Sequence, residues 1–363
     1  MTASAERAAI IYCFLLIRRT RRSFCMPRLL GIVQVFILIL AGFCASAPQA
    51  VAGPKYLFKV ASLAPEGSVW TKRFREFAQE VEDQSNGEVG FKIYAGGVMG
   101  DDLAMYRKMR VGQLNGGGFT MTGIGSVVPD FRVLGIPFLM HSYEEVDQVK
   151  QGLDEYFHKA FAENGLELIA LTEVGFIYTM STAPIATVAE LQKSTCWAPD
   201  NDPLSAGFLE TLGTTPTPLS IPDVLTSLQT GLVSTVFNSL YGSIVLQWYT
   251  KAKYITDMPF GYAYGAFLLD RQQFARLPEK YGALIKTAAA KHFGILLEDT
   301  RKSNEEARSV LQDNGVTLVN IESGALTELE MVRDKTVARL KGKAFSEEIY
   351  AETMRLLTQY RSR

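Results

Sequence analysis

Cysteine and histidine are scarce in this chain, which has four cysteines and three histidines among 363 residues. Three of the cysteines lie within the first 52 residues, at Cys13, Cys25 and Cys44, so Cys196 is the only one beyond them. A single thiol cannot form a disulfide within residues 53–363, even in an oxidising compartment. The three histidines are His141, His158 and His292. Their spacing is not typical of metal sites. The sequence therefore predicts no metal and no cofactor.

Signatures of nucleotide-binding and nucleophilic enzymes are also missing. The glycine-rich segments GGVMGDD (96–102) and LNGGGFT (114–120) match neither the phosphate loop nor the dinucleotide fingerprint, and tight turns explain them. Cys196 acting with a distant histidine is the remaining thiol-nucleophile alternative. A buried cysteine that acts as a small apolar side chain is the preferred interpretation. The sequence predicts a protein that is not an enzyme.

The first 52 residues have the composition of an export signal. Six arginines and one acid accompany an apolar run at 29–47, and AVA at 50–52 is a small-x-small site. These parts predict a secretory signal peptide that is cleaved after residue 52, with Met26 as a possible true start. A twin-arginine signal at 20–26, a lipoprotein site at Cys44 and a retained membrane anchor remain alternatives. The expected location is the periplasm of a Gram-negative type cell.

The net charge limits the classes of molecule that the protein is expected to bind. The whole chain carries −1 and its first 52 residues carry +5, so residues 53–363 carry −6. Nucleic-acid binding needs a basic stripe, and this mild acidity argues against it. No second apolar run approaches the roughly 20 residues that span a bilayer. Membrane contact is therefore expected only through a protein partner or an uncleaved anchor.

Strand and helix patterns alternate along the rest of the chain. Residues 56–64 alternate as a strand, and 67–87 place apolar side chains at helical spacing, ending in SNG. LELIALTEVGFIYTMS (166–181) is long enough for two strands or for one crossing between lobes, and 277–315 reads as one or two long helices. This alternation predicts an α/β fold with mainly parallel sheets, in two lobes joined by strand crossovers.

The order of four segments resembles one family of receptors. These segments are FAQEVEDQSNGEVGFKIYAGGVMGDD (77–102), LGIPFLMHSYEEV (134–146), LGTTPTPLSIPDVLTSLQTGLVSTVFN (212–238) and LPEKYGALI (277–285). Over about 56–345 the chain resembles the DctP-type solute receptors of tripartite ATP-independent periplasmic (TRAP) transporters. The resemblance implies capture of a small molecule and its delivery to membrane permease subunits. A receptor that reports its ligand to a sensory system is the alternative role.

The resemblance also implies the architecture. It implies a type-II periplasmic binding fold, with mixed sheets flanked by helices and a long helix that spans both lobes. The first lobe is expected at 53–175 plus 264–303, and the second at 176–263 plus 304–363. The two lobes are expected to close over one ligand by a hinge motion, which requires contacts that the open form lacks.

The sequence departs from the family pattern where acid-binding members place arginine. Laid on that pattern, Pro199 keeps its place, but the arginine that grips a carboxylate falls on Trp197. A second arginine position falls on Ile177. Asn238 of the second-lobe motif is kept, whereas Phe237 replaces an acid. These substitutions resemble a subgroup with tryptophan in place of the carboxylate-binding arginine.

The departures predict a ligand that is larger or more apolar than a C4-dicarboxylate. A buried carboxylate without a cationic partner would cost several kcal/mol, whereas tryptophan offers an apolar face and one N–H donor. Arg132 or Lys193 could supply a cation instead, which would leave an organic-acid binder as the alternative. The remaining predicted ligand contacts are Leu63 and Met121 in the first lobe and Tyr178 and Tyr241 in the second. Trp70 and Trp248 are expected to be packing residues, although Trp248 follows Asn238 closely enough to face the cleft.

Overall fold

The computed structural model describes residues 53–363. The predicted export signal, with its possible start at Met26, lies outside the described residues. No helix in this described part is both long and apolar enough to cross a membrane.

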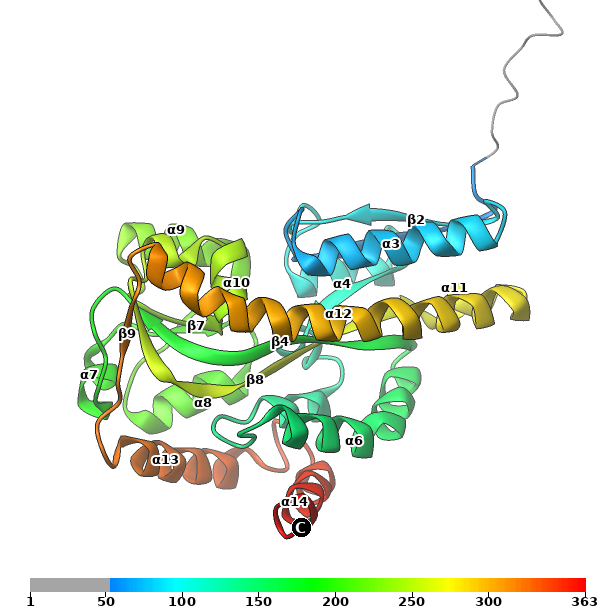
Figure 1. Cartoon of the computed structure of the whole chain (residues 1–363). Coiled ribbons are helices and arrows are strands. Elements are labelled where there is room, and N and C mark those ends of the chain that lie inside the picture. The colour runs from blue at the N-terminus through cyan, green and yellow to red at the C-terminus, as the bar shows by residue number, and fades with distance from the viewer. Residues whose placement is uncertain (1–52) are drawn as a thin grey trace, which may run out of the picture. The chain divides into compact units, whose positions relative to one another are not determined.

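Two lobes share one mixed sheet through two long strands (Figure 1). β4 (Leu166–Ser181) and β8 (Tyr254–Asp270) pair antiparallel through both lobes. The first lobe adds β3, β1 and β2 beside β8, and the second adds β7 beside β4 and β9 beside β8. The chain leaves the first lobe on β4 and returns on β8, so this pairing must be antiparallel. The predicted mainly parallel sheet is therefore wrong, and the mixed sheet implied by the family resemblance is confirmed.

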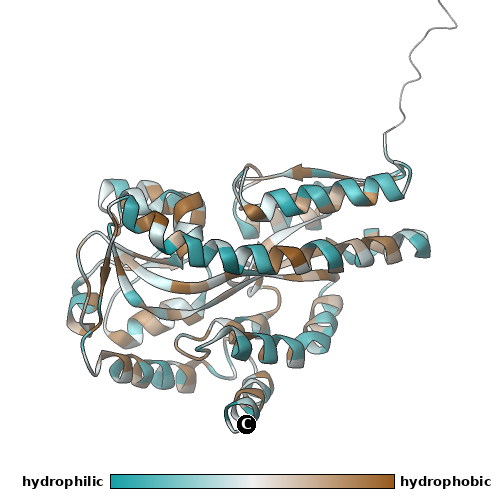
Figure 2. Ribbon diagram, in the orientation of Figure 1, coloured by the Kyte–Doolittle hydropathy of each residue, from teal (hydrophilic) through white to brown (hydrophobic). Residues whose placement is uncertain are grey.

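The first lobe is built on helices that bury one face. α3 begins after Ser68, whose hydroxyl accepts a hydrogen bond from the Thr71 N–H. Its buried side chains include Phe74 and Phe77, which pack on Phe267 of β8; hydrophilic residues alternate with them along α3 (Figure 2). The elements of this lobe are β1 (Tyr56–Ser62), α3 (Val69–Gln84), β2 (Val89–Tyr94), α4 (Asp102–Arg110), β3 (Gly116–Thr120), α5 (Met121–Ile124), η1 (Pro129–Gly135) and α6 (Tyr143–Glu163).

The second lobe packs short elements around two apolar clusters. One cluster centres on Trp197, Trp248 and Val236, and the other on Phe208 with Cys196. Its elements are α7 (Val188–Lys193), β5 (Trp197–Pro199), α8 (Pro203–Leu212), β6 (Thr217–Leu219), η2 (Ile221–Asp223), α9 (Val224–Thr230), β7 (Thr235–Ser239), α10 (Leu240–Val245), η3 (Trp248–Thr250) and β9 (Thr317–Val319).

One 35-residue helix, α12 (Glu279–Asp313), follows the short α11 (Arg271–Phe274) and packs on both lobes. Its first half joins the core of α3 through Ile285 and Phe293. Its second half joins the core of the second lobe through Ala307 and Leu311. The long helix spanning both lobes is therefore confirmed, and it is unbroken (Figure 1).

The predicted lobe boundaries fall inside the shared strands, because Gly175 pairs with Ala263. The C-terminal helices divide differently from the expected 304–363 block. α13 (Ala325–Leu340) packs on α8, whereas α14 (Glu347–Arg361) packs on α6 of the first lobe. A Cβ on Gly152 of α6 would lie 2.5 Å from Leu356 of α14, so the two helices are in close contact.

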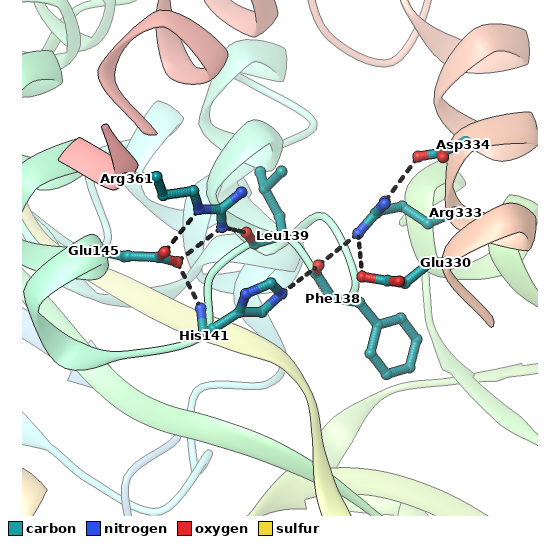
Figure 3. Close-up of polar contacts among 8 residues, drawn as sticks. All are labelled: Phe138, Leu139, His141, Glu145, Glu330, Arg333, Asp334 and Arg361. Atoms are coloured by element: carbon teal, nitrogen blue, oxygen red, sulfur yellow. Dashed lines mark hydrogen bonds and ion pairs between the residues drawn. The ribbon is translucent and has the colours of Figure 1, made fainter. Parts of the chain in front are cut away.

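The loop before α6 is fixed by arginines of both C-terminal helices (Figure 3). Phe138 has φ +53°, and its carbonyl oxygen accepts a hydrogen bond of 2.6 Å from Arg333 of α13. Arg361 of α14 donates to the Leu139 carbonyl at 2.7 Å and to both oxygens of Glu145 at 2.7 and 2.9 Å. These bonds hold a backbone conformation that non-glycine residues rarely adopt.

Removal of the Arg361 guanidinium should destabilise the fold. The Glu145 side chain is only 8% exposed, so Arg361→Met leaves a nearly buried carboxylate without its ion partner. Because Arg361 itself is partly exposed, we expect the free energy of unfolding to fall by on the order of 2 kcal/mol, measured by urea denaturation.

Arg355→Met on the same helix is the matched control, since Arg355 pairs with Glu352 in an exposed ion pair. Equal unfolding free energies for the Arg361 and Arg355 variants would contradict the proposed role of the Arg361–Glu145 pair.

Candidate functional site

A cavity of about 250 Å³ lies between the two lobes. The first lobe contributes the ends of β1 and β3 and the start of α3, and the second contributes β5, β7, α10 and η3. The shared strands β4 and β8 supply the wall between them. Both lobes therefore contribute residues to one partly open space, as closure over a ligand requires.

Six of the eight predicted contact residues line this cavity: Leu63, Met121, Ile177, Trp197, Phe237 and Asn238. Tyr178 and Tyr241 are not part of its wall. The Tyr178 ring lies 6.0 Å from the Arg308 guanidinium, and the Tyr241 hydroxyl accepts a hydrogen bond from the backbone of Val69. The structure thus places these two tyrosines beside the cavity and not in it.

Trp197 serves as both core and cavity wall. Its side chain is 3% exposed, and its ring packs edge-to-face on Trp248 with centroids 5.3 Å apart. Its indole N–H donates to the Leu219 carbonyl at 2.9 Å. The predicted use of this N–H as a ligand donor is therefore wrong in this arrangement, because the neighbouring strand β6 already accepts it. Trp197 offers the cavity only an aromatic surface.

Aromatic residues outside the predicted set also form the wall. Trp70 and Trp248, expected mainly as packing residues, both line the cavity as well as packing against their neighbours. All three tryptophans of the chain therefore face one space. Sequence spacing indicated this only for Trp248, which follows Asn238 by ten positions.

No arginine, lysine or histidine of residues 53–363 lines the cavity. Arg132, a predicted alternative cation, donates to the Asn201 and Ala344 carbonyl oxygens at 3.3 Å and is 6% exposed. Burial lowers its pKa, although the nearby Asp202 carboxylate opposes this effect. Lys193, the other alternative, is exposed at the end of α7. Neither side chain is available to a molecule in the cavity.

Glu173 of β4 is the one charged residue in the described part of the wall. Its side chain is 1% exposed, and its oxygens accept two hydrogen bonds of 2.9 Å from Arg301 of α12 and one of 2.6 Å from the Tyr262 hydroxyl. Burial lowers the pKa of Arg301, but hydrogen bonds to Asp147 and Glu173 outweigh it and raise that pKa overall. The carboxylate is thus already neutralised by the protein, and its role in the wall is structural.

Several uncharged polar side chains also line the wall, among them Asn238, Thr120 and Thr122. The Asn238 Oδ1 atom accepts from the Ser239 N–H at 2.8 Å, whereas its Nδ2 group has no hydrogen-bond partner among residues 53–363. Thr120 donates from its hydroxyl to the buried Asp102 at 2.6 Å, with the Thr122 hydroxyl 3.2 Å away. A mostly apolar pocket with a few fixed donors is typical of small-molecule sites.

Groups that could perform chemistry are separated and engaged elsewhere. Cys196 is fully buried, and burial raises the pKa of its thiol, which disfavours the reactive thiolate. His292 contacts Glu80 at 2.7 Å, outside the cavity wall. Within 53–363 no group of three His, Cys, Asp or Glu side chains could hold a metal ion.

Comparison with known proteins gives one consistent family. Residues 60–342 match the model of DctP, a bacterial extracellular solute-binding protein of family 7. The ectoine-binding periplasmic protein TeaA of Halomonas elongata is 27% identical over 67% of this chain and 71% of its own length. The 2,3-diketo-L-gulonate-binding periplasmic protein YiaO of Escherichia coli is 23% identical over 70% and 77%.

Solved structures share the fold at low sequence identity. A TRAP periplasmic solute-binding protein of Desulfovibrio salexigens with bound orotic acid has a TM-score of 0.78 and 21% identity, covering 85% of this chain and 99% of that one. The sugar acid binding protein DctPAm of Advenella mimigardefordensis, in complex with galactonate, has a TM-score of 0.80 and 20% identity over the same shares. The two-lobed fold expected from the sequence is confirmed.

The Asp102 carboxylate beneath Thr120 predicts a pH-dependent stability. Burial raises the pKa of Asp102 to about 6, although hydrogen bonds from Thr120 act in the opposite direction. A folded-state pKa above the ordinary value of 3.8 means that folding favours the protonated acid. The protonated Asp102 side chain therefore makes its full contribution to the stability of the fold below about pH 4, and this contribution is lost as the pH rises through about 6.

Asp102→Asn fixes a neutral group at this position. Relative to wild type, we expect the variant to gain roughly 3 kcal/mol in free energy of unfolding between pH 4 and pH 7.5. Urea titrations at several pH values measure the difference, with Glu82→Gln on the exposed face of α3 as control. A difference between the variant and wild type that stays constant with pH contradicts the assignment.

Proposed function

The chain belongs to the DctP family of bacterial extracellular solute-binding proteins, and from that premise we propose that it captures a largely apolar or aromatic organic molecule. Its family consists of periplasmic receptors that bind small molecules and deliver them to the membrane permease of a TRAP transporter, so it is a receptor and not an enzyme. The proposal concerns the ligand. We also propose that residues 1–52 direct export and are then removed.

The observation that carries the proposal is a cavity wall without a cation. A carboxylate enclosed there would lose its hydration with no guanidinium or ammonium to replace it, at a cost of several kcal/mol. Glu173, the one acidic wall residue, is already paired with Arg301 and offers no cation to such a ligand. An anionic ligand would therefore incur this desolvation cost, whereas a neutral ligand would not.

The size and surface of the cavity support an aromatic or polycyclic molecule. Its volume of about 250 Å³ exceeds the ~150 Å³ of an apolar cavity that accepts benzene. The partly exposed Trp70 supplies aromatic surface on which a ring packs favourably, and the nearly buried Trp197 and Trp248 contribute smaller parts of the wall. Phe237 of β7 adds a fourth ring.

One polar end of the ligand is expected to contact Asn238. Its Nδ2 group can donate to a hydroxyl or carbonyl oxygen of a neutral molecule without requiring a charge. The Thr122 hydroxyl on the first-lobe side is the second donor or acceptor. The proposed ligand therefore has one or two neutral polar groups at its ends and an apolar body.

The test is a thermal-shift panel with native mass spectrometry on the purified protein. Indole and 2-naphthol represent neutral aromatic ligands, and succinate, malate, 2-oxoglutarate and galacturonate represent acids. A neutral aromatic present at about 100 times its Kd should raise Tm by about 5 °C, because ligand binding at that excess stabilises by ~2.7 kcal/mol. Acids should give no shift.

Two variants show whether binding occurs in the cavity. Leu63→Asp places a carboxylate in the wall and should weaken binding of the neutral aromatic at least about tenfold. Leu57→Asp changes an exposed residue of β1 outside the cavity and should not. Strong stabilisation by any of the four acids would overturn the proposed ligand and support the organic-acid alternative.

A further inference from the structure

Tyr241 makes a hydrogen bond that joins the two lobes directly. It belongs to α10 of the second lobe, and its hydroxyl oxygen accepts from the backbone N–H of Val69 at 3.0 Å. Val69 is the first residue of α3 in the first lobe. Both helices lie along α12 (Figure 1). The contact therefore requires α3 and α10 to approach across the cavity.

The Val69 N–H is available because it stands at a helix start. The first N–H groups of a helix have no acceptor within the helix. The Ser68 hydroxyl accepts from Thr71 and leaves Val69 to find another partner. The positive end of the helix dipole favours an oxygen acceptor at this position. Tyr241 supplies that acceptor from the other lobe.

The surroundings of Tyr241 connect this bond to the shared strand β4. The Tyr241 N–H donates to Asn304 Oδ1 on α12 at 3.0 Å, and Asn304 Nδ2 donates to the Val174 carbonyl of β4 at 2.9 Å. The backbone of Tyr241 is therefore fixed relative to the shared strand next to Gly175, while its hydroxyl reaches the opposite lobe.

Trp70 connects the same bond to the cavity. The Trp70 and Tyr241 rings are 5.1 Å apart at 55°, and the Trp70 indole N–H donates to the Glu173 carbonyl at 2.9 Å. Trp70 lines the cavity, whereas Tyr241 does not. A molecule that packs on Trp70 holds in place the ring against which Tyr241 rests.

We propose that Tyr241 is a positioning residue that holds the lobes closed and so sets the rate of ligand release. A bond that forms only when the lobes approach stabilises the closed state alone. It therefore raises the ratio of closed to open molecules by the factor that corresponds to its free energy. The inference about release rests on the proposed function. The inference about closure does not, because it concerns the lobes alone.

Either partner of the bond can be removed with little other change. Tyr241→Phe deletes the acceptor and keeps the ring contact with Trp70. Val69→Pro deletes the donor, and proline is well tolerated at the first position of a helix. Ser68 has φ −68° and ψ 156°, an extended conformation that suits the residue before proline. The two variants and their combination form a double-mutant cycle.

Closure is measured by the distance between spin labels on the two lobes. Val111→Cys and Leu232→Cys provide exposed labelling sites on the first and second lobes, with Cys13, Cys25 and Cys44 replaced by serine; Cys196 is fully buried and does not compete. Tyr241→Phe should lower the ratio of closed to open molecules about fivefold, the factor for one net hydrogen bond.

The double-mutant cycle separates the loss of the Tyr241–Val69 hydrogen bond from other effects of the two substitutions. Tyr241→Phe should have no further effect in the Val69→Pro background. Tyr254→Phe, which removes a phenolic hydroxyl from β8, should behave as wild type. An unchanged distance distribution in Tyr241→Phe overturns the proposal. An equal shift in the wild-type and Val69→Pro backgrounds also overturns it.

Release is measured separately with 2-naphthol in a stopped-flow displacement experiment. Tyr241→Phe should raise the dissociation rate about fivefold and change the association rate little. If 2-naphthol does not bind wild type, the proposed ligand class fails, while the spin-label distances still decide the closure proposal. An unchanged dissociation rate in a variant that binds 2-naphthol overturns the proposed control of release.

Discussion

The ion pair between Arg301 and Glu173 is the interaction on which the joining of the two lobes depends. Glu173 lies in the middle of the shared strand β4, where the carboxylate is almost completely removed from water. An unpaired charge there would cost several kcal/mol, so the strand requires the α12 guanidinium at this position. Arg301 also reaches Asp147 of α6, and Tyr262 of β8 completes the network. One buried charge thus connects both shared strands, the long helix and the first lobe.

The same network explains why the cavity wall contains a carboxylate, Glu173, but presents no free charge to a ligand. The protein satisfies the oxygens of Glu173 internally, and β6 satisfies the indole N–H of Trp197. What remains for a ligand is largely apolar and aromatic surface, with polar groups that include the Asn238 amide and the Thr122 hydroxyl. Specificity in such a site arises from shape and from the penalty on unpaired charges. The proposed receptor would discriminate against acids because its cavity wall lacks a cation.

Much of the fold could be predicted from the sequence because local periodicity determines it. The helical spacing of 67–87 predicted α3, and the long pattern at 277–315 predicted one or two long helices where the structure has α12. The direction of β4 against β8 could not be predicted, since alternation is the same in either direction. The Arg301–Glu173 pair was missed because its partners are 128 residues apart and each resembles an ordinary surface charge. The wall positions came from the family resemblance, whereas the cross-lobe bond of Tyr241 needed coordinates.

The order in which the strands pair has a consequence for how the chain reaches this state. β3 ends at Thr120, but its neighbour in the sheet is the 265–269 segment of β8. The whole second-lobe segment between β4 and β8 must therefore be made before the first lobe can complete its sheet. Contacts between such distant segments form slowly, because loop-closure entropy opposes them. During synthesis the sheet of the first lobe consequently stays incomplete until residue 269 has been made, so most of the chain must exist before this sheet can form.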